Sequence, residues 1–525
     1  MARGHRNEPS RGTVKSETPS PVANRGWITL SIMLATFMQG VDTTIANVAL
    51  PHMQGSMSAS QDQIAWVITS YIVAAAIMTP LTGWLAGRFG VKYVFLISVA
   101  GFTLASALCG AATSLAELVI YRLLQGVCGA ALVPLSQAVL LQINPPEQHA
   151  RAMAVWGMGV ILGPIIGPAV GGWLTDNYSW RSVFYINVPF GILSALGILI
   201  FIRETRHGRR EAFDWFGFVT LSLAIGALQM MLDRGQLKDW FGSTEIWFEA
   251  TIAALAFYLF IVHTATATDR SFLNRDLMRD ANCMVGTVMM FLIGVPLYGT
   301  MTLLPTMLQD LMNYPVVTTG LVTAPRGIGT MIAMILVARL AGRIDTRLII
   351  MTGLMLTAMS MWQMTGFSLS MGMGPVITTG VLQGFGLGFV FTPLSIITFS
   401  TLPRPMLTQG TAIFSLMRNI GGSVGISIVE ALLAQNTQIV HSRLVEQLRP
   451  DNPLVRGPMM KAPYSLTDPS GVAALNAEAT RQAAMVAYID DFMLMMILVV
   501  IALPLLLLLR RPHARPAAGG AVALD

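Results

Sequence analysis

Fourteen stretches of about 20 mostly apolar residues follow one another along the chain, and mostly short polar segments separate them. A helix needs about 20 such residues to cross a bilayer, so the sequence predicts an all-α membrane protein with fourteen transmembrane helices. The even number places both termini on the same side. The expected helices are 27–49, 63–86, 92–112, 115–143, 151–174, 181–203, 213–233, 246–268, 281–310, 317–341, 347–367, 374–400, 407–436 and 485–510.

The scarcity of charge excludes other classes of protein. Only 11% of the 525 residues are charged, whereas a soluble domain carries about 25%. The charges are too few to cover the surfaces of a soluble chain of this length, or to keep it disordered. The net charge of +6 is small and the basic residues form short clusters, so no nucleic-acid partner is expected.

The basic residues predict the orientation. With the N-terminus inside, fourteen Lys and Arg residues fall in the short inner loops and three in the short outer loops. This is the positive-inside bias, and a miscounted helix would invert it downstream. Both termini are therefore predicted to be cytoplasmic. The outer three are Arg181, Arg234 and Lys238.

No feature of the sequence indicates a cofactor, a metal site or an enzyme. The three cysteines, Cys109, Cys128 and Cys283, lie in apolar stretches, which argues against disulfides and metal clusters. No phosphate-binding loop and no Ser/His/Asp constellation is present.

Two short motifs recur at nearly equal offsets. "LAGRFGVK" at 85–92 resembles "LAGRIDTR" at 340–347, and "LQG" followed by "PLS" occurs at 124–136 and 382–395. The offsets of 255 and 258 residues predict a duplicated six-helix unit with its substrate site between the halves. Ordinary low complexity of membrane segments is the alternative. The predicted parts are a cytoplasmic disordered tail (1–26), an N-terminal six-helix bundle (27–205), two inserted helices (206–270), a C-terminal six-helix bundle (271–511) and a second cytoplasmic tail (512–525).

Several longer motifs carry a family resemblance. They are "QGVDTTIANVALP" (39–51), "GWLAGRFGVK" (83–92), "YRLLQGVCGA" (121–130), "GMGVILGPIIGPAVGGWL" (157–174), "WRSVFYINVPFG" (180–191), "LQMMLDRG" (228–235), "TAPRGIG" (323–329) and "MRNIGGSVG" (417–425). In this order they resemble the major facilitator superfamily, and more narrowly its fourteen-helix drug:proton antiporters, the EmrB/QacA family. The resemblance covers nearly all of 27–510.

The resemblance implies a function. Proteins of this kind exchange protons for hydrophobic or amphipathic toxic compounds across the bacterial inner membrane by alternating access. A narrow exporter of a metabolite or siderophore on the same fold is the alternative. A passive channel is disfavoured, because it has little need of charges inside its helices.

Asp42 is the only charged residue within the apolar body of its helix. A charge at the bilayer centre costs roughly 2.5–3.5 kcal/mol, so Asp42 needs a partner or a wet cavity. Gln39, Thr43 and Asn47 recur near the same face at helical spacing, and we expect them to bind substrate. A carboxylate held away from water can bind and release a proton near neutral pH, which makes Asp42 the candidate proton carrier. A structural hydrogen-bond hub is the alternative.

Arg122 lies in the fourth predicted helix, with Gln125 one turn further on. Arginine keeps its proton, so Arg122 is expected to tune a nearby carboxylate. In the resembled family this motif is linked to proton transfer, whereas Gln125 is a candidate substrate contact. The alternative is that Arg122 snorkels to the membrane interface. The repeat places Gly380 at the position of Arg122, so the second half lacks this charge.

Two motifs are expected to serve conformational change. Small residues at four-residue spacing allow close helix contact, and the prolines that follow two of them permit bending. In the resembled antiporters this pattern marks exporters. The loop 83–92 is predicted to be a cytoplasmic latch, although Gly87 stands where the family usually has Asp. The residues concerned are Gly159, Gly163, Pro164, Gly167, Pro168 and Gly171 in the helix, and Gly83, Arg88, Gly90 and Lys92 in the loop.

The second half also has polar residues within its predicted helices. Gln383, Arg418 and Asn419 are candidate substrate contacts. Arg326 lies in the motif "TAPRGIG" (323–329), which is expected to serve conformational change. Glu430 is either a second proton site or an interfacial residue.

The segment 437–484 is predicted to lie outside as a long loop, and its end reads as a helix running into the last span. EmrB-like pumps have a comparable loop and work with a periplasmic adaptor and an outer-membrane channel. The resemblance therefore implies that this loop contributes to adaptor docking, and a lid without a partner is the alternative.

Overall fold

The computed structural model describes residues 24–204, 213–266, 275–340, 343–403, 406–449, 464–465 and 468–510. Helices form all of the regular structure in these residues, and no β-strand occurs among them. Both predicted tails lie almost wholly outside the described residues. The main helices are α1 (Arg25–Ser56), α2 (Gln61–Met78), α3 (Leu81–Phe89), α4 (Val91–Ala111), α5 (Leu115–Gly129), α6 (Leu132–Ile143), α7 (His149–Asn177), α8 (Ser182–Tyr185), α9 (Asn187–Phe201), α10 (Trp215–Arg234), α11 (Thr244–Thr266), α12 (Arg275–Arg279), α13 (Ala281–Thr306), α14 (Val316–Thr323), α15 (Pro325–Leu340), α16 (Thr346–Met364), α17 (Met373–Phe399), α18 (Leu407–Glu446) and α20 (Pro469–Ala502).

The predicted all-α membrane fold is confirmed. Among the described residues, twelve helices are long and apolar enough to cross a membrane, and the bent pair α2–α3 gives a thirteenth. Helix α16 occupies the remaining predicted span, but it is less apolar than these helices and is not counted among them. The count of fourteen transmembrane helices therefore stays a prediction.

Prolines mark two of the interruptions that divide predicted single spans. Helices α2 and α3 meet at 57° around Thr79–Pro80, and α15 begins at Pro325 directly after α14. Proline lacks the amide hydrogen that a continuing helix needs, and it is tolerated where a new helix begins.

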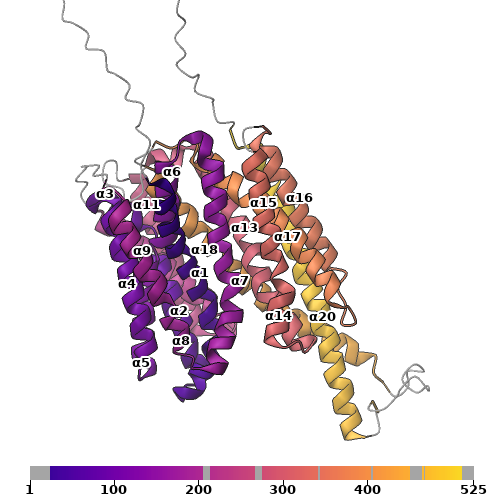
Figure 1. Cartoon of the computed structure of the whole chain (residues 1–525). Helices are drawn as coiled ribbons and strands as arrows, with labels where there is room; N and C mark the ends of the chain where they lie inside the picture. Colours follow the sequence, from indigo (N-terminus) through magenta and orange to yellow (C-terminus); the bar gives the residue numbers. More distant parts are fainter. Residues whose placement is uncertain are drawn as a thin grey trace, which may run out of the picture.

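The two halves of the chain repeat one pattern of helix pairing. In the first half α1 packs on α7 and α9, α4 packs on α5 and α9, and α2 packs on α5. In the second half α13 packs on α18 and α20, α16 packs on α17 and α20, and α15 packs on α17. Figure 1 shows the halves side by side, the first in indigo to magenta and the second in orange to yellow. This is the pairing expected of a duplicated six-helix unit, although the domain limits themselves stay a prediction.

The two helices between the halves pack mainly on each other. Helix α10 also contacts α2 and α18, so it touches both halves. Helix α11 exposes large apolar side chains, which suits a surface that faces lipid. They include Trp247, Phe248, Leu255, Phe257 and Tyr258.

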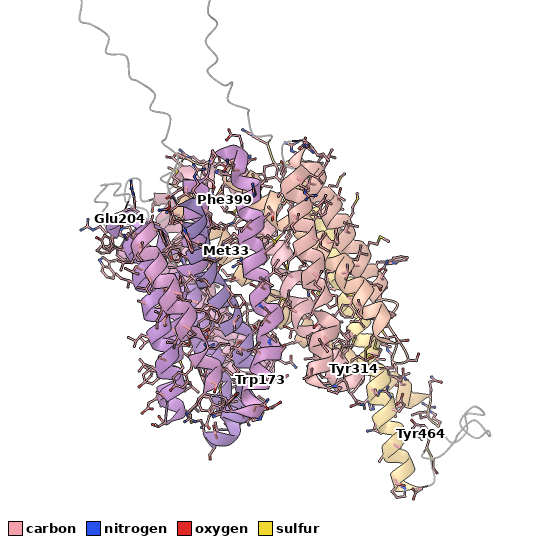
Figure 2. All side chains as sticks on the ribbon, viewed as in Figure 1. Met33, Trp173, Glu204, Tyr314, Phe399 and Tyr464 are labelled. Atoms are coloured by element: carbon pink, nitrogen blue, oxygen red, sulfur yellow. The ribbon has the colours of Figure 1, made fainter. Side chains whose placement is uncertain are left out.

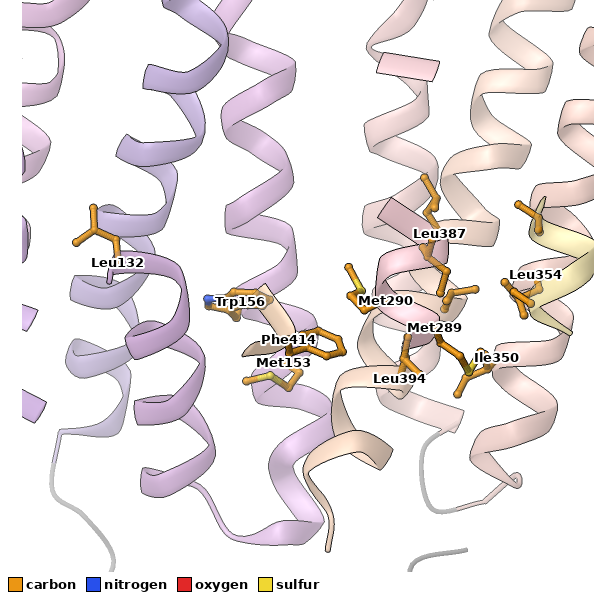
Figure 3. Close-up of a cluster of buried hydrophobic side chains, with 14 of the residues drawn as sticks. Leu132, Met153, Trp156, Met289, Met290, Ile350, Leu354, Leu387, Leu394 and Phe414 are labelled. Atoms are coloured by element: carbon orange, nitrogen blue, oxygen red, sulfur yellow. The ribbon is translucent and has the colours of Figure 1, made fainter. Parts of the chain in front are cut away.

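Apolar packing joins the halves toward the end that carries the chain termini. Trp156 of α7 stacks on Phe391 of α17 with ring centroids 5.9 Å apart, and Figure 3 shows Phe414 of α18 beside Met153 and Trp156. The Thr411 hydroxyl donates a hydrogen bond to the carbonyl of Pro134 at 3.1 Å. Helix α7 also contacts α14 and α15 of the second half.

The predicted outer loop is largely helical. Helix α18 continues ten residues beyond the predicted end of its span, to Glu446, and α20 begins at Pro469. The two extensions pack together, and His441 Nε2 forms a hydrogen bond with Asn476 Oδ1 at 3.0 Å. The extension of α18 into the start of the predicted outer segment 437–484 was not expected from the sequence. The prediction of a helix leading into the last span is confirmed.

Candidate functional site

Asp42 and Arg122 form an ion pair inside the first half. Arg122 Nη1 donates to Asp42 Oδ2 at 2.8 Å, and the two side chains are 1% and 0% exposed. Gln125 Nε2 donates to Asp42 Oδ1 at 2.8 Å, and its own Oε1 accepts from Arg122 Nη1 at 2.8 Å. The three residues that the sequence singled out on α1 and α5 therefore form one closed network.

The guanidinium of Arg122 is held on several sides. Its Nε donates to the carbonyl of Val67 on α2 at 3.1 Å, and its plane lies 4.4 Å from the ring centroid of Tyr71 and 5.7 Å from that of Phe184. Cation–π contacts of this kind strengthen when water is excluded. The interpretation of Arg122 as a snorkelling interfacial residue is therefore wrong.

Asn187 is a member of the network that the sequence reasoning missed. Its Nδ2 donates to Asp42 Oδ1 at 2.8 Å and to the hydroxyl of Ser106 at 2.9 Å, and its side chain is 1% exposed. Asn187 is the first residue of α9 and stands within "WRSVFYINVPFG", where one amide in an apolar stretch is the signal that could have found it. With Asn187, both oxygens of Asp42 are satisfied by donors, which is the environment of an ionised carboxylate.

The other polar residues of α1 do not share this environment. Thr43 and Asn47 are exposed and Gln39 is partly buried, whereas Asp42 is fully buried. The residues expected on one face therefore divide between two surroundings, because Asp42 lies at one edge of a broad polar face and Asn47 at the other. Thr43 and Asn47 are exposed, and their role as substrate contacts stays a prediction.

The glycines of α7 place it directly against α1. A Cβ at Gly163 would lie 2.6 Å from the carbonyl carbon of Gly40, and one at Gly167 would lie 2.2 Å from Thr44 Oγ1. Gly159 and Gly171 face Met33 and Ile45 in the same way. The predicted close contact is confirmed, and it fixes the backbone of α1 beside Asp42. Pro164 and Pro168 lie within α7 on the same contact segment.

Substitution of Gly163 by Ala should destabilise the protein by about 1–3 kcal/mol, because the added carbon meets backbone atoms that cannot move aside. Thermal unfolding measured through the reactivity of the buried thiols checks this. Gly172→Ala on the same helix is the matched control, since its Cβ would meet nothing closer than Val48 at 3.9 Å. Equal unfolding temperatures for the two variants would contradict the packing argument.

The second half has a neutral counterpart of the network. Gln383, which the repeat aligns with Gln125, donates from Nε2 to Thr300 Oγ1 at 3.2 Å and is fully buried. Arg418 is 6% exposed, with its Nε 3.4 Å from Asn419 Oδ1 and its guanidinium 6.0 Å from the ring of Phe391. These residues do not converge with Asp42 in the described structure.

Arg326 and Glu430 are not part of the hydrogen-bond network around Asp42 in the described structure. Arg326 Nη2 donates to the carbonyl of Leu297 at 3.2 Å, which ties α15 to α13. Glu430 is half-buried on α18 and interacts electrostatically with Asp233 of α10, whose carboxylate accepts a hydrogen bond from Thr69. Both interpretations of Glu430, a second proton site and an interfacial residue, stay open.

The loop motif lies where α3 meets the second half. A Cβ at Gly83 would lie 3.0 Å from Cα of Gln409 on α18, so this glycine permits a close approach between the halves. Gly90 has φ of +95°, which favours glycine, and the Glu204 carboxylate occupies the space that a Cβ would need. Lys92 Nζ donates to the carbonyl of Leu199 at 2.7 Å, and Arg88 is exposed.

Substitution of Gly83 by Val should shift the protein away from the state in which the halves meet at the terminus-bearing end, because the branched side chain collides with α18. Distances between spin labels at the exposed positions Phe89 and Thr401 should then lengthen. Gly87→Val is the control, since a Cβ there meets nothing within 4 Å. An unchanged distance distribution in Gly83→Val would contradict a role for this contact.

Two further carboxylates inside predicted spans were missed. Asp233 ends one predicted span and Asp491 lies near the start of another, where a carboxylate at the membrane boundary is ordinary. Asp491 is 1% exposed. Only the three-dimensional structure places its carboxylate inside the bundle.

The Major Facilitator Superfamily model matches residues 32–426, which include the Asp42 network and the contact of α7 with α1. The chain belongs to the major facilitator superfamily. It is therefore a multi-pass membrane protein of a transporter family, and the fold expected from its motifs is confirmed.

Relatives with described roles agree with this assignment. The chain is 38% identical to the multidrug export protein EmrB of Escherichia coli (strain K12), over 81% of this chain and 83% of the relative. It is 37% identical to the fatty acid resistance protein FarB of Neisseria gonorrhoeae, over 82% and 85%. The narrower resemblance to EmrB is thereby confirmed.

Solved structures at low identity share the fold. The human organic anion transporter MFSD10 aligns with a TM-score of 0.58 at 14% identity, over 90% of this chain and 99% of that one. The proton:xylose symporter XylE aligns with a TM-score of 0.58 at 13% identity, over 90% and 94%. Both structures share the helix arrangement of Figure 1.

Proposed function

We propose that the protein is a secondary active exporter that couples inward proton flow to the efflux of hydrophobic or amphipathic toxic compounds. The buried Asp42–Arg122 pair carries this proposal, since an intramembrane ion pair is expensive and indicates a proton pathway. The export direction and the substrate class rest on the 38% identity to EmrB.

The network supplies a coupling step. When Asp42 is ionised, Arg122, Gln125 and Asn187 all donate to it, and α1, α5 and α9 are held together. A proton on Asp42 removes the charge that Arg122 neutralises, so the guanidinium must find another partner. Protonation therefore changes the relative stability of the two arrangements of the bundle, which is what alternating access requires.

The driving force is sufficient. One charge that crosses 100 mV supplies about 2.3 kcal/mol before any pH gradient is added. The protein would lie in the bacterial inner membrane with both termini cytoplasmic, because the basic residues cluster in the loops on the side of the termini. Contact between the halves near the termini would then make this conformation closed to the cytoplasm.

Transport by the full-length protein in liposomes tests the proposal. An imposed inward proton gradient should drive efflux of a lipophilic cationic dye, and addition of dye should in turn move protons. Liposomes without protein and gradient-collapsing ionophores are the controls. An efflux rate of the dye that does not depend on the proton gradient would overturn the proposal.

A periplasmic adaptor and an outer-membrane channel are the proposed partners. The helical extensions of α18 and α20 project beyond the rest of the molecule at the end opposite the termini (Figures 1 and 2), which suits a docking surface. Recovery of an adaptor with the full-length protein, and not with a variant whose 447–468 connection and flanking turns are shortened, would support this. Equal recovery with both would refute it.

A narrow exporter of one metabolite is the second candidate. The relative FarB is named for resistance to fatty acids, which are a narrower class of compound. A panel of dyes, fatty acids and siderophores in the same liposomes distinguishes the two candidates.

A further inference from the structure

Asp491 of α20 is buried without a partner. Its side chain is 1% exposed, and neither carboxylate oxygen accepts a hydrogen bond within the described part of the chain. Asp42 is equally buried but receives donors at both oxygens. The two buried carboxyls therefore lie in opposite surroundings, one suited to the ionised form and one to the neutral acid.

The position of Asp491 inside the second half follows from its neighbours. Tyr488 and Met495 lie on the same face of α20, three and four residues away. The sulfur of Met495 lies 2.9 Å from the position of a Cβ on Gly299 of α13, and the adjacent Phe492 packs edge-on against Phe367 with centroids 6.0 Å apart. Asp491 thus faces the junction of α13, α18 and α20.

Among the described residues, no basic side chain donates a hydrogen bond to Asp491 or forms an ion pair with it. Asp490 on the same helix is exposed and acidic. Arg481 of α20 donates from Nε to the carbonyl of Leu311 at 3.2 Å. Arg347 of α16 donates to the carbonyl of Leu509, beyond the C-terminal end of α20. The remaining titratable groups on α20 and on the elements packed against it are Glu478 on α20, Asp310 after α13, Cys283 and Tyr298 on α13, and Glu430, Arg418, His441, Arg443 and Glu446 on α18.

One helical turn before Asp491 on α20, the buried Tyr488 reaches the exposed Thr306 of α13. The Tyr488 hydroxyl donates to Thr306 Oγ1 at 3.3 Å, at the point where α13 becomes the π-helix Met307–Leu311. Asp310 on this π-helix is exposed, and Tyr488 lies three residues before Asp491 on α20. π-Helical turns are rare and occur frequently at functional sites. Tyr314, which follows this turn, is labelled at the end of the molecule opposite the termini (Figure 2).

We propose that Asp491 is a second proton-binding site, separate from Asp42, which takes a proton from water at the end opposite the termini by way of Tyr488 and releases it on the other side during the cycle. No electron transfer is involved, because one proton joins the carboxylate oxygen and later leaves it. A metal ion is a poorer occupant, since no group of three or more His, Cys, Asp or Glu in the described residues is arranged to hold one. The inference rests on the proposed proton-coupled export and predicts its stoichiometry.

Two measurements test the assignment, with Asp490→Asn as the matched control. Infrared spectra of the full-length protein in lipid nanodiscs at neutral pH should lose a protonated-carboxyl band in Asp491→Asn and keep it in Asp490→Asn. In liposomes, the number of protons moved per dye molecule should fall by about one in Asp491→Asn alone. Asp491→Ser removes the same carboxyl and replaces the Asn variant if that variant does not fold.

The outcomes separate this inference from the proposed function. A difference spectrum that shows only ionised carboxylate, or an unchanged proton count, would overturn the site. Sodium-dependent transport that is lost in Asp491→Asn at an unchanged proton count would assign the site to a cation instead. Uncoupled dye movement in the wild type refutes proton-coupled export, whereas the infrared result on Asp491 stands independently.

Discussion

Asp42→Asn should reduce proton-coupled efflux to the level of protein-free liposomes. Asparagine has nearly the shape of aspartate, but its single carbonyl oxygen can accept either from Arg122 or from Gln125 and Asn187, and it cannot take up a proton in this pH range. The charge change that alters the network is therefore lost while the packing of α1 is kept. Efflux driven by an imposed pH gradient, and proton movement on addition of dye, both measure the effect.

Asp176→Asn is the control for this prediction. Asp176 lies near the end of α7 and is exposed, so its neutralisation should leave efflux unchanged. Gradient-independent dye exchange should persist in Asp42→Asn if the variant still changes conformation. A variant that still drives protons against dye would show that Asp42 is a structural hub, which is the alternative that its sequence context allows.

The helical architecture and the main ion pair were predictable from sequence because both follow from the cost of polar groups in a bilayer. Long apolar segments must form helices, and a charge within them needs a partner. Asp42 and Arg122 could therefore be recognised from sequence as charged residues inside apolar spans. Gly163 and its neighbours were visible for a related reason, since a regular spacing of small residues indicates a close helix contact.

Other members of the site depend on contacts between distant segments. Asn187 is one amide at the start of α9, and only the packing of α9 on α1 brings it to Asp42. Asp491 lies close to the expected boundary of its span, where carboxylates are ordinary, and its burial arises because α20 continues outward alongside α18. Helix boundaries were the least predictable feature, since a helix that leaves the membrane can continue in water when a neighbour covers it.

Arg122→Gln should destabilise the protein by about 3–5 kcal/mol, the cost typical of removing one partner from a buried ion pair. The loss leaves the Asp42 carboxylate buried with only the amides of Gln125 and Asn187, and it leaves the carbonyl of Val67 without its donor. Arg122→Lys should fall between the wild type and Arg122→Gln, because one ammonium group keeps the charge but cannot reproduce the planar set of contacts. Thermal unfolding followed by a thiol-reactive fluorophore measures the change.

The double variant Asp42→Asn/Arg122→Gln separates charge from shape. Removing both charges leaves no uncompensated ion, so most of the stability lost in Arg122→Gln should return, whereas coupled transport should not. The thiol readout suits this comparison, since Cys109 is buried beside Gln125, with its sulfur 3.7 Å from Oε1, and becomes reactive when the network opens. If the double variant were as unstable as Arg122→Gln, the contacts of Arg122 with Val67 and Tyr71 would contribute more to stability than its pairing with Asp42. Protonation of Asp42 would then have little effect on the position of the guanidinium.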